Sequence, residues 1–253
     1  MKDLLSAEVL KLRSTRTALG LFIAALLVSI VPAILVLVFV PAGGLEENGA
    51  PLTVLLGASI VPTLGLVFGI LSMTNEYRHG TITYSYLVTP KRWQVIAVKL
   101  VVCFVVGVVV LAVAGALLVL VALVGYQVRG LDMDTGSILT VQAVKTVALI
   151  LVTAGLMASF GVALGALVRN QPVAVAGTLI WALAVESIIF GLKPAVGQYL
   201  PFSAMEQVVS GALTMGPESE VGLDRPEAFL LSLAYIAVTS VVAVSTSMRR
   251  DVT

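Results

Sequence analysis

Residues able to carry out catalysis are scarce in this chain, and they form no known catalytic pattern. His79 and Cys103 are the single histidine and the single cysteine, so a zinc site with three or four such ligands is not expected. The phosphate-binding pattern GxxxxGK followed by Ser or Thr is absent, and no Gly-Lys pair occurs. HExxH and GxSxG are absent as well. We therefore expect a chain that is not an enzyme and binds no metal or cofactor, with any ATP and magnesium held by a separate subunit.

One acidic residue, Glu186, falls inside a long apolar segment, about seven residues or ~10 Å along a helix from its nearer end. A carboxylate there is costly unless it is protonated, paired or in contact with water, so it is a candidate for function. Two interpretations stay open. Glu186 lines a translocation path or joins a polar network that outer helices open, or it hydrogen-bonds neighbouring helices and supports packing. A proton relay is not expected, because the apolar segments contain no second acid and no histidine.

The composition indicates which elements must position these residues. The chain is 59% hydrophobic and 11% charged, whereas soluble domains are about 25% charged. It is thus predicted to be an integral membrane protein with one transmembrane domain over residues 1–253. The apolar runs show no alternation of the kind found in β-barrel strands, so the fold class is all-α. Six segments are each long enough to cross roughly 30 Å of hydrocarbon: 18–40, 52–73, 100–124, 147–168, 173–192 and 229–247.

Basic residues are concentrated on one side of this predicted topology. The N-terminal segment, residues 75–99, residues 169–172 and the C-terminal tail hold eleven Lys and Arg, whereas the other three loops hold four, together with nine acids. The positive-inside rule then places both termini in the cytoplasm of a multi-pass protein of the cell membrane. Residues 1–17 are expected to form an interfacial helix rather than part of a signal peptide, because the following apolar run exceeds roughly 7–15 residues.

Residues 75–99 form the main polar segment of the first half of the chain, and their order predicts helix, break, short helix, break, helix. Gly80 is expected to end the first helix, because glycine adopts positive φ at no steric cost. Thr81 would cap a short helix over 82–88, and Thr89-Pro90 would start the third helix. A short helix lying against the cytoplasmic face is suited to receive a push from a soluble partner.

Small residues and a long external loop complete the pattern. Residues 193–227 are acidic, but their first half is too apolar to be free in water, so we expect one or two short helices that dip back at the outer leaflet. Two small-residue pairs allow close helix packing, within the chain or at a dimer interface, although such pairs also arise by chance: Gly65 with Gly69, and Gly161 with Gly165.

Several residues resemble, in type, spacing and position, the cytoplasmic loop of type-2 ABC-transporter permeases: Glu76, Gly80-Thr81, Pro90, Arg92 and Lys99. The resemblance covers nearly the whole chain, including a short polar turn at 169–172 and residues 199–202, which are similar to the start of the re-entrant helices of that family. In that family this loop carries a coupling helix that docks on the ATP-hydrolysing subunit. Eight residues are thereby implied in coupling to the ATPase subunit: Glu76, Arg78, His79, Gly80, Thr81, Tyr84, Pro90 and Arg92.

The resemblance implies a permease subunit of an ATP-driven transporter that exports a hydrophobic or amphipathic substrate of drug, lipid or peptide type. Implied partners are two ABC-type ATPase subunits, a second permease copy or a homologous permease, and membrane lipids; no nucleic acid is expected. For Glu76 two interpretations stay open: it pairs with Arg78, with Arg92 or with a residue of a partner, or it is a solvated charge at a helix end. The alternatives are an ion-driven secondary transporter or channel, and a regulatory membrane subunit that carries no substrate.

Overall fold

The computed structural model describes residues 2–14, 16–41, 61–88, 92–131, 141–210, 213–214 and 220–249. These residues are almost entirely helical, as predicted. One small exception was not predicted. Two-residue strands β1 (Leu213–Thr214) and β2 (Glu220–Val221) pair antiparallel, with Leu213 opposite Val221.

The helices follow the apolar segments, because a chain in hydrocarbon must satisfy its backbone hydrogen bonds internally. The fifth predicted span is a continuous helix made of three consecutive segments, of which the middle one, η1, is π-helical. The helical elements in chain order are α1 (Lys2–Ser14), α2 (Arg16–Phe39), α4 (Val61–Arg78), α5 (Thr81–Val88), α6 (Arg92–Val128), α8 (Val141–Val168), α9 (Gln171–Ile180), η1 (Trp181–Val185), α10 (Glu186–Leu192), α11 (Pro194–Gly197), α12 (Pro201–Ser210) and α13 (Arg225–Arg249).

Five helices among the described residues are long and apolar enough to cross a membrane, over Leu19–Phe39, Trp93–Val128, Lys145–Val168, Gln171–Leu192 and Arg225–Thr246. The predicted second span, 52–73, is described only from Val61 onward, as part of α4, so the count of six stays a prediction. The third helix was predicted to start at Thr89-Pro90 and its apolar span at residue 100. Helix α6 begins at Arg92, close to the predicted helix start and ahead of the apolar span, because hydropathy marks the apolar part of a helix and not its polar first turns.

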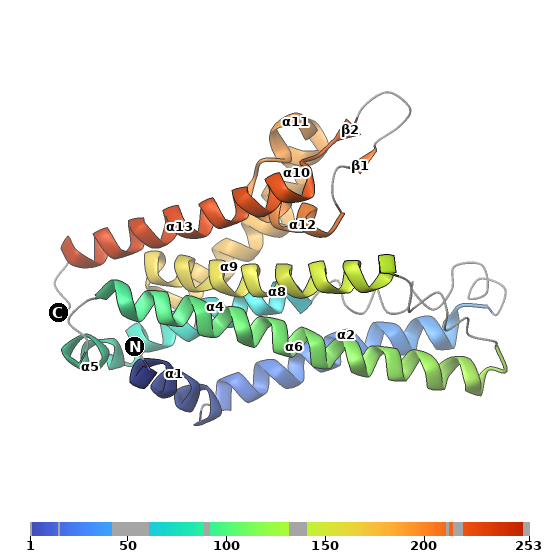
Figure 1. The fold of residues 1–253 in the computed structure, drawn as a ribbon, viewed down its shortest axis with the longest axis horizontal. Coiled ribbons are helices and arrows are strands. Elements are labelled where there is room, and N and C mark those ends of the chain that lie inside the picture. Colours follow the sequence, from blue (N-terminus) through green and yellow to red (C-terminus); the bar gives the residue numbers. More distant parts are fainter. Residues whose placement is uncertain are drawn as a thin grey trace.

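Helix α8 is the centre of the bundle. It packs against α4, α6, α12 and α13, and Figure 1 shows it between α13 and α6. Its contacts with α4 and α12 are filled by large apolar side chains that are almost fully buried: Leu66, Ile70, Leu156, Met157, Phe160 and Met205. Close van der Waals packing of these side chains holds the helices together, because lipid is as apolar as the side chains themselves and supplies no hydrophobic driving force between helices.

The seam between α4 and α8 depends on glycine. A Cβ atom added at Gly69 would overlap the carbonyl oxygen of Ala158, and one at Gly161 would overlap that of Leu66. The two backbones therefore touch, which only small residues permit. The partner helix belongs to the same chain, so the contact seen here is internal. All four glycines of the predicted pairs lie in this seam: Gly65, Gly69, Gly161 and Gly165.

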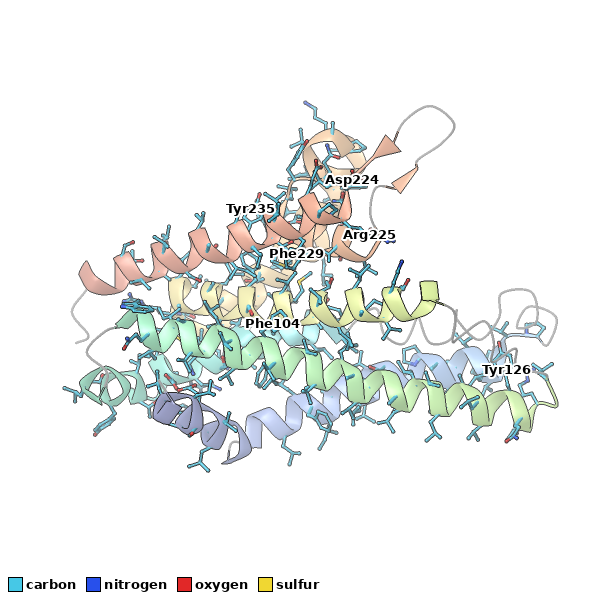
Figure 2. All side chains as sticks on the ribbon, viewed as in Figure 1. Phe104, Tyr126, Asp224, Arg225, Phe229 and Tyr235 are labelled. Atoms are coloured by element: carbon cyan, nitrogen blue, oxygen red, sulfur yellow. The ribbon has the colours of Figure 1, made fainter. Side chains whose placement is uncertain are left out.

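A second tight junction holds α2 to α6 at the end of the bundle away from α5. The Arg129 guanidinium, through Nη1, donates hydrogen bonds to the carbonyl oxygens of Leu37 (2.7 Å) and Val40 (2.6 Å). A cation at the carboxyl end of a helix satisfies carbonyls that have no partner within the helix and complements the helix dipole. Leu37 and Tyr126 are buried together beneath this contact, and Tyr126 is seen at that end in Figure 2.

Short helices α11 and α12 fill the stretch between α10 and α13, where one or two short helices were expected, and Figure 1 shows them gathered at one end of α13. The ring of Phe202 meets that of Phe160 edge to face at 5.5 Å. The Tyr235 hydroxyl on α13 donates to the carbonyl oxygen of Tyr199 at 2.7 Å. These contacts fix α12 against α8 and α13. That the two helices dip into the membrane stays a prediction.

Candidate functional site

A cluster of four charged side chains joins the N-terminal helix to the start of the polar segment and to α6. Lys99 Nζ lies 2.7 Å from Glu8 Oε2 and 3.1 Å from Glu76 Oε1. Lys11 Nζ lies 2.7 Å from Glu8 Oε1 and 2.8 Å from the same Glu76 Oε1. Glu8 and Lys11 belong to α1, Glu76 to the last turns of α4, and Lys99 to the first turns of α6. We call these four residues the ion cluster.

Three of the four members of the ion cluster are buried, and Lys11 is partly exposed. The exposed fractions of Lys99, Glu8 and Glu76 are 3%, 5% and 7%. Charges so far from water are stable only when they are paired and hydrogen-bonded. The two acids and two bases cancel in charge, and Lys99 also donates to the carbonyl oxygen of Ser72 at 3.3 Å. The cluster is therefore a unit in which each member compensates the burial of the others.

The two members on α1 titrate away from their ordinary range. Burial acts to raise the pKa of the Glu8 carboxyl, but Lys99 and Lys11 outweigh it and the pKa is lowered. Burial acts to lower the pKa of the Lys11 ammonium, but its bonds to Glu76 and Glu8 outweigh it and the pKa is raised. Both shifts favour the charged forms, so the α1 half of the cluster stays ionised at neutral pH.

The partners expected for Glu76 are corrected by this geometry. Its carboxylate pairs with Lys11 and Lys99 of the same chain, whereas the Arg78 guanidinium donates to Gln171 Oε1 at 3.2 Å. The expectation of Arg78 was wrong because that side chain, two residues on, leaves the helix in another direction. The side chain of Arg92 lies outside the described residues. Sequence reasoning missed Glu8 and Lys11, whose spacing of three on a helix was the available signal.

Helix α5 matches the predicted short helix. Gly80 before it has φ +67°, the conformation that glycine tolerates, so the break falls where it was predicted. Thr81, predicted as the cap, is instead the first residue of the helix, and its hydroxyl donates to the Glu76 carbonyl oxygen at 3.5 Å. Ile82 is buried against Met73 and Ile96.

The opposite face of α5 is open. Tyr84 and Leu87 have exposed fractions of 73% and 75%, and Trp93 at the start of α6 is also exposed. The arrangement presents an apolar surface on a helix that is anchored at one point. His79, just before it, is exposed too, while Pro90 lies outside the described residues.

The predicted tight turn at 169–172 lies beside the end of α4. Besides the Arg78–Gln171 bond, the Arg169 guanidinium sits 5.3 Å from the centre of the Tyr77 ring. The Asn170 side chain accepts a hydrogen bond from the backbone N–H of Val173 and so caps α9. The turn, α5 and the ion cluster thus surround the same end of α4.

Glu186 is buried at the other polar centre of the molecule, where it caps α12. Its carboxylate accepts hydrogen bonds from the backbone N–H groups of Phe202 (3.1 Å) and Ser203 (2.9 Å), from the Ser203 hydroxyl (3.1 Å) and from Trp181 Nε1 (2.8 Å). The negative charge faces the positive end of the helix dipole. This geometry supports the interpretation of Glu186 as a packing residue, and a role in a translocation path stays a prediction.

Gln207 adds further hydrogen bonds around α12, and sequence reasoning did not identify it. Its amide nitrogen donates to the carbonyl oxygens of Gln198 and Ser203, each at 3.0 Å, and its oxygen accepts from the backbone N–H of Leu223 at 2.6 Å. One side chain therefore joins the turn before α12, α12 itself and the segment entering α13. In the part of the chain that the structure describes, no three His, Cys, Asp or Glu side chains come close enough to hold a metal ion.

The described residues thus form a bundle of long apolar helices, with the ion cluster and the exposed short helix α5 at one end. The family model described as ABC-2 family transporter protein matches residues 45–252. The chain therefore belongs to the ABC-2 transporter family and is a membrane permease of an ABC transporter. No curated protein and no solved structure matches it. The match begins after Glu8 and Lys11, so half of the ion cluster lies outside it.

Proposed function

We propose that this permease exports a hydrophobic or amphipathic substrate and is driven by a separate ATPase subunit that docks on α5. The observation that carries the proposal is the exposed apolar face of α5. Tyr84 and Leu87 are mostly uncovered although Ile82, on the same short helix, is almost fully buried. Exposed aromatic and aliphatic side chains on an anchored helix are typical of a protein-binding surface. ATP and magnesium are bound by the partner, not by this chain.

The ion cluster supplies the transmission step of this proposal. A push on α5 reaches the end of α4 through the short break at Gly80, and Glu76 lies just before that break. Glu76 is paired with Lys99 of α6 and with Lys11 of α1. Helices α1, α4 and α6 are thereby made to move together, because separating any of them exposes an unpaired buried charge.

The complete transporter is proposed to contain two permease copies, or this permease and a homologue, with two ATPase subunits. The segment α9–η1–α10 supports this, because it is the least buried of the five candidate spans and leaves an apolar face for a second permease or for lipid. Both termini and α5 lie in the cytoplasm, with the protein in the cell membrane. The excess of Lys and Arg at these segments supports that orientation.

The state of Glu186 favours an ATP-driven cycle over the ion-driven alternative. Glu186 is the single charge of the six predicted spans, and both of its carboxylate oxygens accept hydrogen bonds from the start of α12. A group committed to a cap is poorly suited to bind and release an ion in each cycle. The apolar spans support a hydrophobic or amphipathic cargo.

The docking surface can be tested by purifying the tagged protein from its native cells in mild detergent and assaying the eluate for ATPase subunits and ATP hydrolysis. The variant Tyr84→Glu/Leu87→Glu is compared with Val128→Glu, a matched control, because Val128 is equally apolar and exposed but lies at the other end of α6. Wild type and control should recover a P-loop ATPase in roughly equal amounts. The double variant should lose it about thirtyfold, the size of an interface hot spot. A folded wild-type protein without an ATPase partner would refute the proposal.

A further inference from the structure

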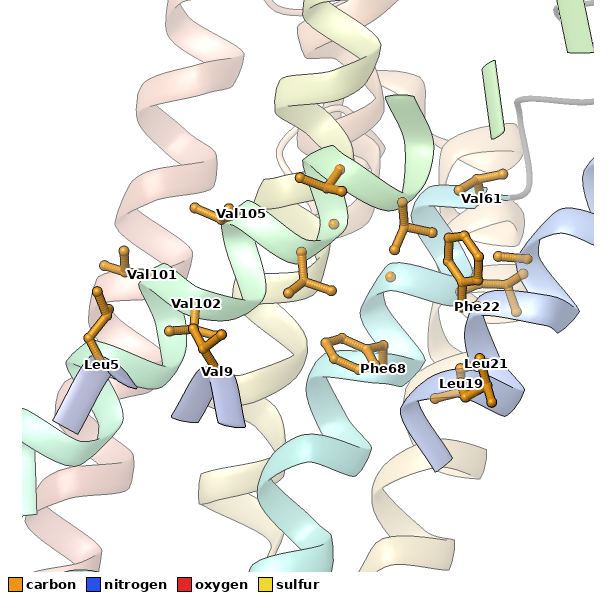
Figure 3. Close-up of a pocket in the computed structure, with 17 residues that line it drawn as sticks. Leu5, Val9, Leu19, Leu21, Phe22, Val61, Phe68, Val101, Val102 and Val105 are labelled. Atoms are coloured by element: carbon orange, nitrogen blue, oxygen red, sulfur yellow. The ribbon is translucent and has the colours of Figure 1, made fainter. Parts of the chain in front are cut away.

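An apolar cavity of 740 Å³ lies between α1, α2, α4 and α6 (Figure 3). Helix α1 contributes Leu5 and Val9, α4 contributes Phe68, and α6 contributes Val101 and Val105. The cavity volume lies within the range of about 300–1,000 Å³ that is usual for ligand sites. Two of its walls, α2 and α6, are candidate membrane spans. Apolar cavities are not filled by water, so the natural occupant at this depth is a hydrocarbon chain.

A second cavity of 340 Å³ adjoins the apolar one, since Leu21, Phe68 and Val102 line both. Its lining surface is also mostly apolar, and we call it the polar cavity for the charged side chains that border it. The polar cavity is lined by all four members of the ion cluster and by His79. The two cavities together have the layout of an amphiphile. A hydrocarbon compartment leads into a compartment of charged and hydrogen-bonding groups at the end of the bundle where α1 lies.

The Glu76 carboxylate indicates which kind of polar group fits. Oε1 accepts from both Lys11 and Lys99, whereas Oε2 is buried and has no hydrogen-bond partner among the described residues. Glu76 itself is 7% exposed and lines the polar cavity. A buried carboxylate oxygen without a donor is costly, so a ligand that brings a hydrogen-bond donor is favoured there, and a charged N–H donor bonds a carboxylate more strongly than a neutral donor does. The two acids and two lysines of the cluster balance in charge. Even so, Glu76 Oε2 still has no hydrogen-bond donor among the described residues.

We propose that the joined cavities bind one membrane phospholipid with a primary-amine head group, its acyl chain in the apolar cavity and its ammonium donating to Glu76 Oε2. A quaternary ammonium cannot serve, because it has no N–H to donate. The bound lipid would hold α1 against α2, α4 and α6. This site goes beyond the transport proposal and does not depend on it.

The test uses the full-length protein, stripped of lipid in detergent and titrated with phosphatidylethanolamine or phosphatidylcholine of the same acyl chains, with bound lipid counted by native mass spectrometry. Wild type should retain one phosphatidylethanolamine about tenfold better than phosphatidylcholine, as expected for one hydrogen bond to a charged group. Val105→Phe should weaken retention severalfold, because the larger side chain takes part of the space that an acyl chain would fill in the apolar cavity. Val124→Phe should leave it unchanged, since Val124 is on the same helix and equally exposed (53% against 52%) but does not line the cavity.

Val109→Phe provides a second cavity-filling variant if Val105→Phe does not fold, because Val109 lines the cavity and is equally exposed. Equal retention of the two lipids would overturn the head-group assignment and with it the proposal. Equal retention by the Val105→Phe and Val124→Phe variants would overturn the site. A detergent-resistant dimer that is lost in Val105→Phe, with no lipid retained by wild type, would show that a second copy of the chain fills the cavity instead.

Discussion

At the scale of single residues, the two lysines of the ion cluster differ in how far they are buried. Lys99 is almost fully buried, whereas the side chain of Lys11 is 43% exposed. Both contact Glu8 and Glu76, at distances between 2.7 and 3.1 Å. Water can partly replace Lys11 when it is removed, but it cannot reach the position of Lys99. The two lysines therefore differ in what their loss costs, although their contacts look alike.

We predict that Lys99→Met lowers the free energy of unfolding by about 3–5 kcal/mol, because it removes a cation from a position that water cannot reach and leaves buried carboxylate charge uncompensated there. Lys11→Met should cost no more than about 1 kcal/mol, the usual worth of a solvent-screened pair. Thermal unfolding of both variants and wild type in the same detergent at neutral pH measures the difference. Equal losses for the two variants would contradict the burial argument. A loss from Lys99→Met that is restored by adding Glu76→Gln would support it.

At the scale of elements, the features that were predicted correctly are those that neighbouring residues in the sequence determine. The break at Gly80 and the short helix α5 were predictable because positive φ and helix starts depend on neighbouring residues alone. The ion cluster was not, since Lys11 and Glu76 are 65 residues apart and Glu8 and Lys99 are 91 residues apart. Nothing in the sequence pairs them until the helices are packed. Glu186 was found as a candidate from its sequence, but its role as a cap required the position of α12.

The glycine contacts between α4 and α8 were also only partly predictable from the sequence. Spacing of four identified Gly65, Gly69, Gly161 and Gly165, but spacing cannot say whether the facing helix belongs to this chain or to another copy. Gly107 of α6 also approaches α8, where an added Cβ would lie 2.7 Å from the carbonyl oxygen of Ala154. It has no glycine partner four residues away, so the pattern could not find it. Helix α8 is thus held by glycine contacts from both α4 and α6.

We predict that Gly69→Ala destabilises the protein by about 1–3 kcal/mol, because the new methyl group has no space against the Ala158 backbone and forces α4 from α8. Gly20→Ala is the matched control. Gly20 lies inside α2 with no atom within 4 Å of an added Cβ, so alanine there should be neutral or stabilising by roughly 0.5–1 kcal/mol. Thermal unfolding of the two variants distinguishes steric overlap from helix propensity. If the Gly69→Ala variant were as stable as the Gly20→Ala variant, the backbones of α4 and α8 would have to lie farther apart than they do in the structure.

At the scale of the whole molecule, the ends of the chain constrain the number of crossings. Figure 1 shows α1 and the C-terminal end of α13 at the same end of the bundle as α5. Five crossings would leave α1 and the end of α13 on opposite faces of the membrane, whereas six return the chain to the face where it began. Five candidate spans are found among the described residues, and α4 is the remaining apolar helix that can supply the sixth.

We therefore predict that α5 and both ends of the chain react from the cytoplasm while α11 and α12 react from outside. Tyr84→Cys and Tyr199→Cys place single exposed thiols on the two faces, and the native Cys103 is buried and adds little background. A membrane-impermeant thiol reagent should label Tyr199→Cys in intact cells and Tyr84→Cys only in inverted vesicles. If the chain crosses the membrane six times, a cysteine added after Thr253 should be labelled in the same way as Tyr84→Cys, that is, only in inverted vesicles. Labelling of that cysteine from outside would mean an odd number of crossings, and α4 would then be a helix that enters the membrane without spanning it.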